Sequence, residues 1–260
     1  MIKCENISYS YEDYQYNEVE VLKDISFEIN EKERVLLFGI NGSGKSTLLK
    51  LLNGLIYPKS GTYQFNNEIV NKKYLKKNSK TFRQTLSLQM QDPSSMLFNP
   101  TVYDEIAFGL KQFEFDELDA KVHHWAKLFK IEKILKTSPL TLSGGQKQKV
   151  LLASLLCIEP KVLLMDEPTA HLDPPTTGWL VDFLKELEIT SLIATHNLSL
   201  GKELGERAIV LGEKHQIIYD GEIKTLLEDS STLIEAQLLH KHTHSHNKLE
   251  HEHYHLHDWK

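Results

Sequence analysis

The sequence has few cysteines, no long apolar run and no excess of positive charge. Its two cysteines are too few for the disulfide framework of a small secreted domain. The longest uninterrupted apolar stretches, such as residues 162–165, fall far short of the roughly 20 residues that a membrane-spanning helix needs. No basic segment followed by an apolar one opens the chain. These absences predict a soluble protein of a reducing, cytosolic compartment.

The charge and the length narrow the possible classes of protein further. The net charge of -6 and the isoelectric point near 6.1 argue against a general nucleic-acid binder. The 260 residues, 40% of them hydrophobic, suffice for a substantial core in one large α/β domain or in one with inserted subdomains. Five lysines would form a basic stripe on a helix, either as a solvated face or as a contact for anionic lipid headgroups. They are Lys72, Lys73, Lys76, Lys77 and Lys80.

What the sequence does contain is a phosphate-binding loop. Residues 39–46 fit the pattern G-x-x-x-x-G-K-[ST], between an expected buried strand at 34–38 and leucines at helical spacing. Glycines let the backbone N–H groups point inward, and a helix beginning near Lys45 adds its positive end, so we expect a bound anion. Lys45 would pair with the β- and γ-phosphates, Ser46 would bind Mg²⁺ and Thr47 would contact the α-phosphate. The expected nucleotide-binding residues here are Asn41, Gly42, Ser43, Gly44, Lys45, Ser46 and Thr47.

Two carboxylates follow a second apolar strand. Residues 162–165 have the length of a central parallel strand, and Asp166 and Glu167 come directly after it, at the sheet edge where ligands bind. We expect Asp166 to hold Mg²⁺, usually through water, and Glu167 to orient and polarise the water that attacks the γ-phosphate. A further expected strand, 191–195, ends at His196.

A third motif, Thr-Leu-Ser-Gly-Gly-Gln, occupies residues 141–146. Ser143 and Gln146 have the spacing of a capping box, which predicts that a helix begins there. Gly144 and Gly145 leave the backbone bare at that helix start. A bare, positively polarised helix N-terminus is an anion site, yet this one has no phosphate of its own.

In this order, the three motifs resemble those of the ATPase subunit of ABC transporters. The resemblance extends over about residues 9–196. It implies a P-loop NTPase core of mostly parallel α/β structure, an antiparallel β subdomain at roughly 1–30 and 60–90 and a helical subdomain at about 92–150, within an ATPase domain of residues 1–239.

The resemblance also implies roles for residues outside the three motifs. Gln91 matches the glutamine loop, which senses Mg²⁺ and the attacking water; Gln89 lies close by, but the proline that follows favours Gln91. His196 would contact the γ-phosphate. Tyr11 would stack on adenine, although Tyr11 or Tyr9 could instead only cover the β subdomain.

In the family two subunits associate head to tail and enclose two ATP molecules. Ser143 and Gly145 of one subunit would complete the γ-phosphate site of the other, with Gly144 and Gln146 in the same motif. Asp173 belongs to a loop that communicates across this interface, in which His171 replaces a commoner small residue. The implied cofactors are ATP and Mg²⁺. The implied partners are a second ATPase subunit, identical or paralogous, and polytopic transmembrane subunits, which place the chain at the cytoplasmic face of the membrane; no nucleic acid is expected.

Three passages resemble the energy-coupling-factor importers for vitamins, cobalt and nickel: 52–55, 100–102 and 107–109. In addition, residues 240–260 form a histidine-rich tail in which histidines alternate with other residues. Imidazole favours nickel, copper, zinc and cobalt over magnesium or calcium, so the tail predicts a transition-metal site, with a tail of no function as the alternative. The expected ligands are His240, His242, His244, His246, His251, His253, His255 and His257.

The sequence therefore predicts the ATP-hydrolysing subunit of a nickel or cobalt importer, with the tail as a metal buffer or sensor. A vitamin importer and a zinc or manganese ABC importer remain alternatives. A soluble nickel-metallochaperone GTPase also combines a phosphate loop with histidine tracts, but its N-K-x-D motif fails at the last position of residues 71–74. Soluble ABC ATPases that act on DNA or ribosomes usually have coiled-coil insertions or tandem cassettes, and neither occurs here.

Overall fold

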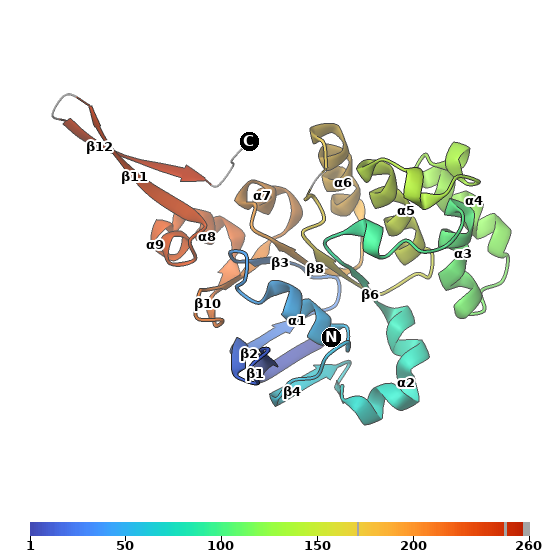
Figure 1. Cartoon of the computed structure of the whole chain (residues 1–260), viewed down its shortest axis with the longest axis horizontal. Coiled ribbons are helices and arrows are strands. Elements are labelled where there is room, and N and C mark those ends of the chain that lie inside the picture. Colours follow the sequence, from blue (N-terminus) through green and yellow to red (C-terminus); the bar gives the residue numbers. More distant parts are fainter. Residues whose placement is uncertain (171, 247–248, 257–260) are drawn as a thin grey trace.

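The computed structural model describes the backbone of residues 1–170, 172–246 and 249–256, and the side chains of these residues as far as Leu239. An antiparallel sheet with the strand order β2-β1-β4-β5 lies on one side of the molecule (Figure 1). Along β2, apolar side chains alternate with exposed polar ones towards its end, so one face of this sheet is buried. Its strands are β1 (Ile2–Glu12), β2 (Glu18–Ile29), β4 (Ser60–Phe65) and β5 (Glu68–Ile69).

The second sheet has six strands in the order β10-β9-β3-β8-β7-β6. Its strands are parallel except β10, which pairs antiparallel with β9. The central strands are buried at nearly every position because helices cover both faces, as in other parallel sheets. They are β3 (Arg34–Phe38), β6 (Leu86–Gln89), β7 (Val162–Asp166), β8 (Thr190–Thr195), β9 (Arg207–Leu211) and β10 (Ile217–Glu222).

Helix α1 (Lys45–Leu52) lies between the two sheets. Four of its leucines are buried in one cluster together with side chains from β1, β2 and β3. The helix is therefore apolar on most of its circumference, which explains the close recurrence of leucine after the phosphate loop.

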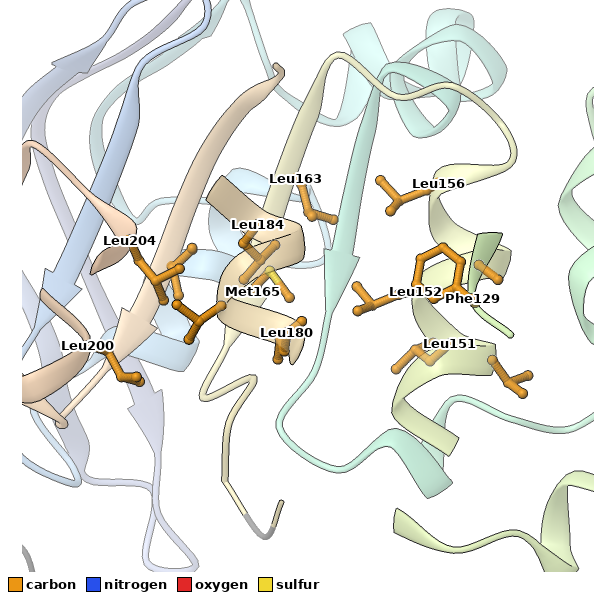
Figure 2. Packing of buried hydrophobic residues seen from close by; sticks show 14 of the residues in the cluster. Phe129, Leu151, Leu152, Leu156, Leu163, Met165, Leu180, Leu184, Leu200 and Leu204 are labelled. Atoms are coloured by element: carbon orange, nitrogen blue, oxygen red, sulfur yellow. The ribbon is translucent and has the colours of Figure 1, made fainter. Parts of the chain in front are cut away.

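The helical part shares its core with the parallel sheet. Figure 2 shows Leu151 and Leu152 of the helix at 144–156 beside Phe129, with Leu163 and Met165 of β7 nearby. All belong to one continuous hydrophobic cluster, so these helices are packed firmly against the sheet. The helices on this side are α3 (Val102–Gln112), α4 (Leu118–Leu128), α5 (Gly144–Leu156) and α6 (Pro174–Glu186).

The structure corrects two expected boundaries. Residues 72–89 are not part of the antiparallel sheet: α2 (Lys72–Thr85) and β6 occupy them, and β6 is a parallel strand of the core. All four β6 residues are buried, as expected for a strand covered on both faces. The helical part also continues beyond residue 150, since α5 ends at Leu156. The lysine stripe does lie on α2, which buries Leu75 and Phe82 and has non-helical backbone angles at Asn78.

After β10 the chain forms two short helices and a hairpin. The strands of the hairpin, β11 (Leu239–His246) and β12 (Leu249–Leu256), project from the body of the molecule (Figure 1). No helix within the described ranges is long and apolar enough to span a bilayer. The short helices of the C-terminal half are α7 (Gly201–Leu204), α8 (Ile223–Glu228) and α9 (Ser230–Glu235).

Candidate functional site

The phosphate loop connects the end of β3 to the start of α1. Gly44, the N-cap residue of α1, has φ of 109°. A Cβ atom at this position would lie 2.4 Å from the Val21 carbonyl oxygen, so both the backbone angle and the space require glycine. The loop thus places the N-terminus of α1, with its free N–H groups, at the edge of the sheet.

Lys45 is folded back over its own loop. Its Nζ donates hydrogen bonds to the carbonyl oxygens of Gly39 at 2.6 Å and Ile40 at 3.2 Å, and lies 3.6 Å from Glu167 Oε1. Burial lowers the pKa of Lys45, while the carboxylates of Glu167 and Asp166 raise it in part. The ammonium group is held at the point where strands β3 and β7 end.

Asp166 is the last residue of β7 and is buried. Burial raises the pKa of its carboxyl group, a hydrogen bond from Ser46 lowers it, and the neighbouring Glu167 raises it again. Asp166 Oδ1 is buried and has no hydrogen-bond partner among the described residues, and the same holds for Ser43 Oγ of the phosphate loop. Unpaired buried oxygens are rare in folded proteins, and these two are free to accept a hydrogen bond from water or to contact a bound ion.

Glu167 and His196 meet because their strands are neighbours. Strands β7 and β8 pair in parallel, with Asp166 opposite Ala194, so both chains leave the sheet at the same edge. His196 Nδ1 lies 2.8 Å from Glu167 Oε1. Glu167 is 5% exposed and has φ of 46°, an angle that few residues other than glycine adopt. Its N–H donates to Ala194 O at 2.9 Å, which fixes this turn.

A hollow of 330 Å³ opens beside Lys45, Asp166 and Glu167. Gln91 lines it, whereas Gln89 is completely buried and exchanges two hydrogen bonds with Gln148 of α5. The structure therefore places Gln91, and not Gln89, at the hollow. The other lining residues are Val21, Ile40, Asn41, Gly42, Gly44, Lys45, Ser46, Thr47, Asp166 and Glu167.

Tyr11 lies beside the first turn of α1. Its hydroxyl is 3.4 Å from Thr47 Oγ1, its side chain is 39% exposed, and its ring meets the Tyr9 ring edge to face at 4.9 Å between centroids. The hydroxyl of this half-exposed side chain thus reaches the helix turn that follows the phosphate loop.

Residues 141–146, here called the signature motif, form the expected helix start. Ser143 Oγ accepts a hydrogen bond from the Gln146 N–H at 3.4 Å, and Gln146 Oε1 accepts one from the Ser143 N–H at 3.0 Å, which completes a capping box. None of the residues Ser143, Gly144, Gly145 and Gln146 lines the hollow around the phosphate loop. Within the described part of one chain, the signature motif therefore does not reach the hollow at the phosphate loop.

Sequence reasoning missed Thr176, which joins the signature motif to the Asp173 loop. Asp173 caps α6 by accepting a hydrogen bond from the Thr176 N–H at 2.8 Å, and this hydrogen bond lowers the pKa of Asp173. A Cβ atom on Gly145 would lie 2.8 Å from Thr176 Oγ1. No local pattern marks this contact, because it joins two helix starts that are distant in the sequence. His171 lies outside the described residues.

A second contact that the sequence did not reveal involves His215. Its Nδ1 lies 3.3 Å from the carbonyl oxygen of Ser43, so the turn between β9 and β10 touches the phosphate loop. A single histidine in a turn carries no pattern from which this contact could be predicted.

Comparison with known proteins agrees with this arrangement. The family model described as ABC transporter matches residues 22–170. The chain belongs to the ABC transporter family. A putative ABC transporter ATP-binding protein of Methanosarcina acetivorans is 45% identical over 91% of this chain and 88% of its own length. The family ATPase activity, and the P-loop fold with its three expected parts, are thereby confirmed.

Other relatives of this ABC ATPase carry more specific names. The nickel import ATP-binding protein LarO of Lactiplantibacillus plantarum is 35% identical over 92% of this chain and 99% of its own length. The energy-coupling factor transporter ATP-binding protein EcfA of Methanosphaera stadtmanae is 34% identical over 92% and 85%. These names confirm the resemblance to the energy-coupling-factor branch.

Two solved structures resemble this chain closely. CbiO1 of Clostridium perfringens, described as part of the ABC transporter complex CbiONQ, aligns with a TM-score of 0.76 and 32% identity over 91% of this chain and 94% of its own. The ATP-binding cassette MJ0796, described as a dimer bound to ADP and phosphate, aligns with a TM-score of 0.77 and 25% identity over 86% and 99%.

Seven of the eight tail histidines lie on the strands of the hairpin. His240, His242, His244 and His246 belong to β11, and three others to β12; His257 lies outside the described residues. Among the residues whose side chains are described, no group of three or more His, Cys, Asp or Glu side chains could hold a metal ion. The β12 members are His251, His253 and His255.

Proposed function

We propose that this ABC ATPase powers the import of nickel or cobalt through a transmembrane partner, and that the residues around the phosphate loop bind and hydrolyse MgATP. One observation supports the nucleotide site: Lys45, Asp166, Glu167 and Gln91 line the same hollow. Lys45 would bind the β- and γ-phosphates once these replace its carbonyl partners. Glu167, held by His196, would orient and deprotonate the attacking water.

The residues around Asp166 fit a magnesium ion. Mg²⁺ prefers oxygen ligands, and Asp166 offers a buried carboxylate oxygen that has no hydrogen-bond partner within the described ranges. Ser46, which hydrogen-bonds Asp166, and Gln91 would hold the ion with it. When bound, Mg²⁺ neutralises part of the phosphate charge; the chain itself contributes the position of the phosphates and the base.

Glu167→Gln tests the assignment of the base. The amide keeps the size of the side chain but cannot take a proton, so hydrolysis should fall by about 10² to 10⁴ while ATP binding persists. Single-turnover hydrolysis and ATP calorimetry separate the two effects. Lys45→Ala is the matched comparison, because it should lose ATP affinity. Wild-type turnover in Glu167→Gln would contradict the assignment.

We infer further that two such subunits bind ATP between them. Ser143 caps a helix whose exposed N-terminus has no phosphate in its own chain, and the similar cassette MJ0796 is a dimer. Ser143 and Gly145 of one subunit would complete the γ-phosphate site of the other, with Asp173 near the interface. Mixing Ser143→Arg with Lys45→Ala subunits would leave one site with both defects and one intact. Normal ATP-dependent dimerisation and hydrolysis by Ser143→Arg alone would refute the trans arrangement.

An apolar groove suits a helix of the transmembrane partner. It has a volume of 650 Å³, lies beside the strand that leads to Gln91, and is bordered by Phe98, which is 68% exposed and meets the Phe108 ring at 5.0 Å. CbiO1, a similar structure, belongs to a larger transporter complex. Phe98→Glu should therefore release the chain from membranes containing its partner, whereas Ile234→Glu, at another exposed apolar site, should not. Equal retention of both variants would refute this docking site.

Nickel or cobalt is the substrate that the tail and the relatives favour together. One relative is a nickel import protein, and seven of the eight tail histidines lie on the hairpin. Vitamin, zinc and manganese importers stay as alternatives, while membership in the ABC family excludes the metallochaperone GTPase. Cells that express the complete transporter should accumulate ⁶³Ni in a manner that depends on Glu167. Uptake of a vitamin without nickel uptake would contradict the proposed substrate.

The tail should bind metal without serving hydrolysis. Truncation after Leu239 removes the hairpin but no residue of the nucleotide site, so basal ATPase activity should be unchanged. Metal bound by the full chain should be released as the pH falls below about 6.5, where imidazoles become protonated. Equal metal stoichiometry in both forms would leave the tail without the proposed role, and a loss of ATPase activity would make it part of the folded domain.

A further inference from the structure

The register of the hairpin places histidines directly opposite histidines. His240 pairs with His255, His242 with His253, and His244 with His251. We call each of these opposed pairs a rung, and the three rungs together the His ladder. The sequence shows only that histidines alternate with other residues; the register matches three histidine positions of one strand with three of the other. His246 lies opposite Leu249 and forms no rung.

All six ladder positions share one face of the hairpin. They occupy every second position of each strand, and side chains alternate between the two faces of a sheet. The positions between the rungs hold other residue types on both strands: Lys241 opposite Tyr254, Thr243 opposite Glu252 and Ser245 opposite Glu250. Histidine thus stands at three consecutive register positions of one face on both strands.

The spacing of such a ladder matches a four-nitrogen metal site. Directly opposed residues of an antiparallel pair have Cβ atoms about 4.5–5.5 Å apart. Successive rungs are about 6.8 Å apart, which is two residues of an antiparallel strand. Four histidine positions in two adjacent rungs therefore form a small rectangle, and imidazole nitrogens bind divalent nickel, copper, cobalt and zinc in preference to hard cations.

We propose that the His ladder binds one divalent transition-metal ion through the four histidines of two adjacent rungs, and that this binding depends on the hairpin register. The proposal rests on the metal-binding tail in the proposed function, but not on which substrate the transporter carries. The ladder is anchored to the body, because β11 begins at Leu239, which is buried, and is joined to α9 by residues 236–238.

Only the middle rung belongs to both possible metal sites, so its removal tests the proposal. Two sites are available, an inner one formed by the first and second rungs and an outer one formed by the second and third, and both use His242 and His253. Loss of the middle rung leaves no two adjacent rungs. Loss of either end rung leaves one complete site. In a flexible tail with the same six histidines, removal of any of the three pairs would weaken metal binding equally.

Nickel calorimetry of the full-length chain at about pH 7.5, where free imidazoles are neutral, tests this difference. The variants are H242T/H253T for the middle rung, and H240T/H255T and H244T/H251T for the ends; threonine suits a strand and is a poor ligand for nickel. Loss of a group that only holds a metal ligand in place weakens metal binding by about 10- to 100-fold, so removal of two ligands themselves should weaken it by at least about 100-fold. Each end variant should stay within about tenfold of the wild type, since four ligands remain.

An exchange of neighbours provides the matched control. K241H/H242K keeps the number of histidines but moves one to the other face, and should weaken binding about as much as a ligand loss. Equal losses in all three rung variants, or wild-type affinity in the exchange variant, would overturn the ladder. Unchanged ATPase activity confirms that the body of each variant is folded. If the rung pattern holds but cells take up no nickel or cobalt, the proposed substrate fails and the ladder stands.

Discussion

The amide pair formed by Gln89 and Gln148 allows a quantitative test of how the core joins the glutamine loop to the signature helix. Gln89 ends β6, two residues before Gln91, and Gln148 lies in α5, the helix that begins at the signature motif. Each side chain is at most 1% exposed, and each donates to the other, at 3.1 and 3.0 Å. The two amides therefore depend on each other for their hydrogen bonds.

Removal of one partner should cost more than removal of both. In Gln148→Leu the Gln89 amide stays buried without its partner, which costs about 2 kcal/mol and lowers Tm by roughly 4–8 °C in a chain of this size. Gln89→Leu should behave in the same way. The double variant replaces both amides with apolar groups of similar size, so its unfolding free energy should return to within about 1 kcal/mol of the wild type.

Calorimetric unfolding of the nucleotide-free wild type, both single variants and the double variant completes this cycle. A favourable coupling energy of at least about 1.5 kcal/mol supports the reasoning. A double variant destabilised by the sum of the two single changes would refute it, since the amides would then contribute independently.

Three further predictions concern other contacts. Tyr11→Ala should weaken ATP binding by about 1–3 kcal/mol in calorimetry, with Tyr11→Phe close to wild type; an equal effect of Tyr14→Ala, at a fully exposed site, would contradict base stacking. Gly145→Ala should lower ATPase activity by about tenfold, because the methyl group overlaps Thr176, and Thr176→Ala should restore part of it; no rescue would exclude this clash as the cause. Asp229 caps α9, and hydrogen bonds from the next hydroxyls and N–H groups lower its pKa to about 2. Its stabilisation is therefore complete above the unfolded pKa of about 3.9 and disappears as the pH falls towards 2, so the difference in unfolding free energy between the wild type and Asp229→Asn should shrink as the pH falls through this window; a difference that stays constant would contradict this role of the carboxylate.

The local patterns of the sequence determined the elements that carry the nucleotide chemistry. The strand, glycine loop and helix at 34–52, the apolar strand before Asp166 and the capping box at Ser143 all appear where the sequence predicts them. Each is specified within a few residues, by glycine at a positive φ angle, by a continuous apolar run or by a cap at a fixed spacing. Such features need no distant partner to be recognised.

Only the tertiary structure decided which of these residues meet. It assigned 86–89 to the parallel sheet, buried Gln89 and left Gln91 at the hollow, joined Gly145 to Thr176, and matched the histidines of β11 with those of β12. These outcomes depend on pairing between segments and on strand register, and a shift of one residue would change every contact. The alternation of residue types shows that a strand has two faces; the partner that lies against each face is fixed by the packing of the whole chain.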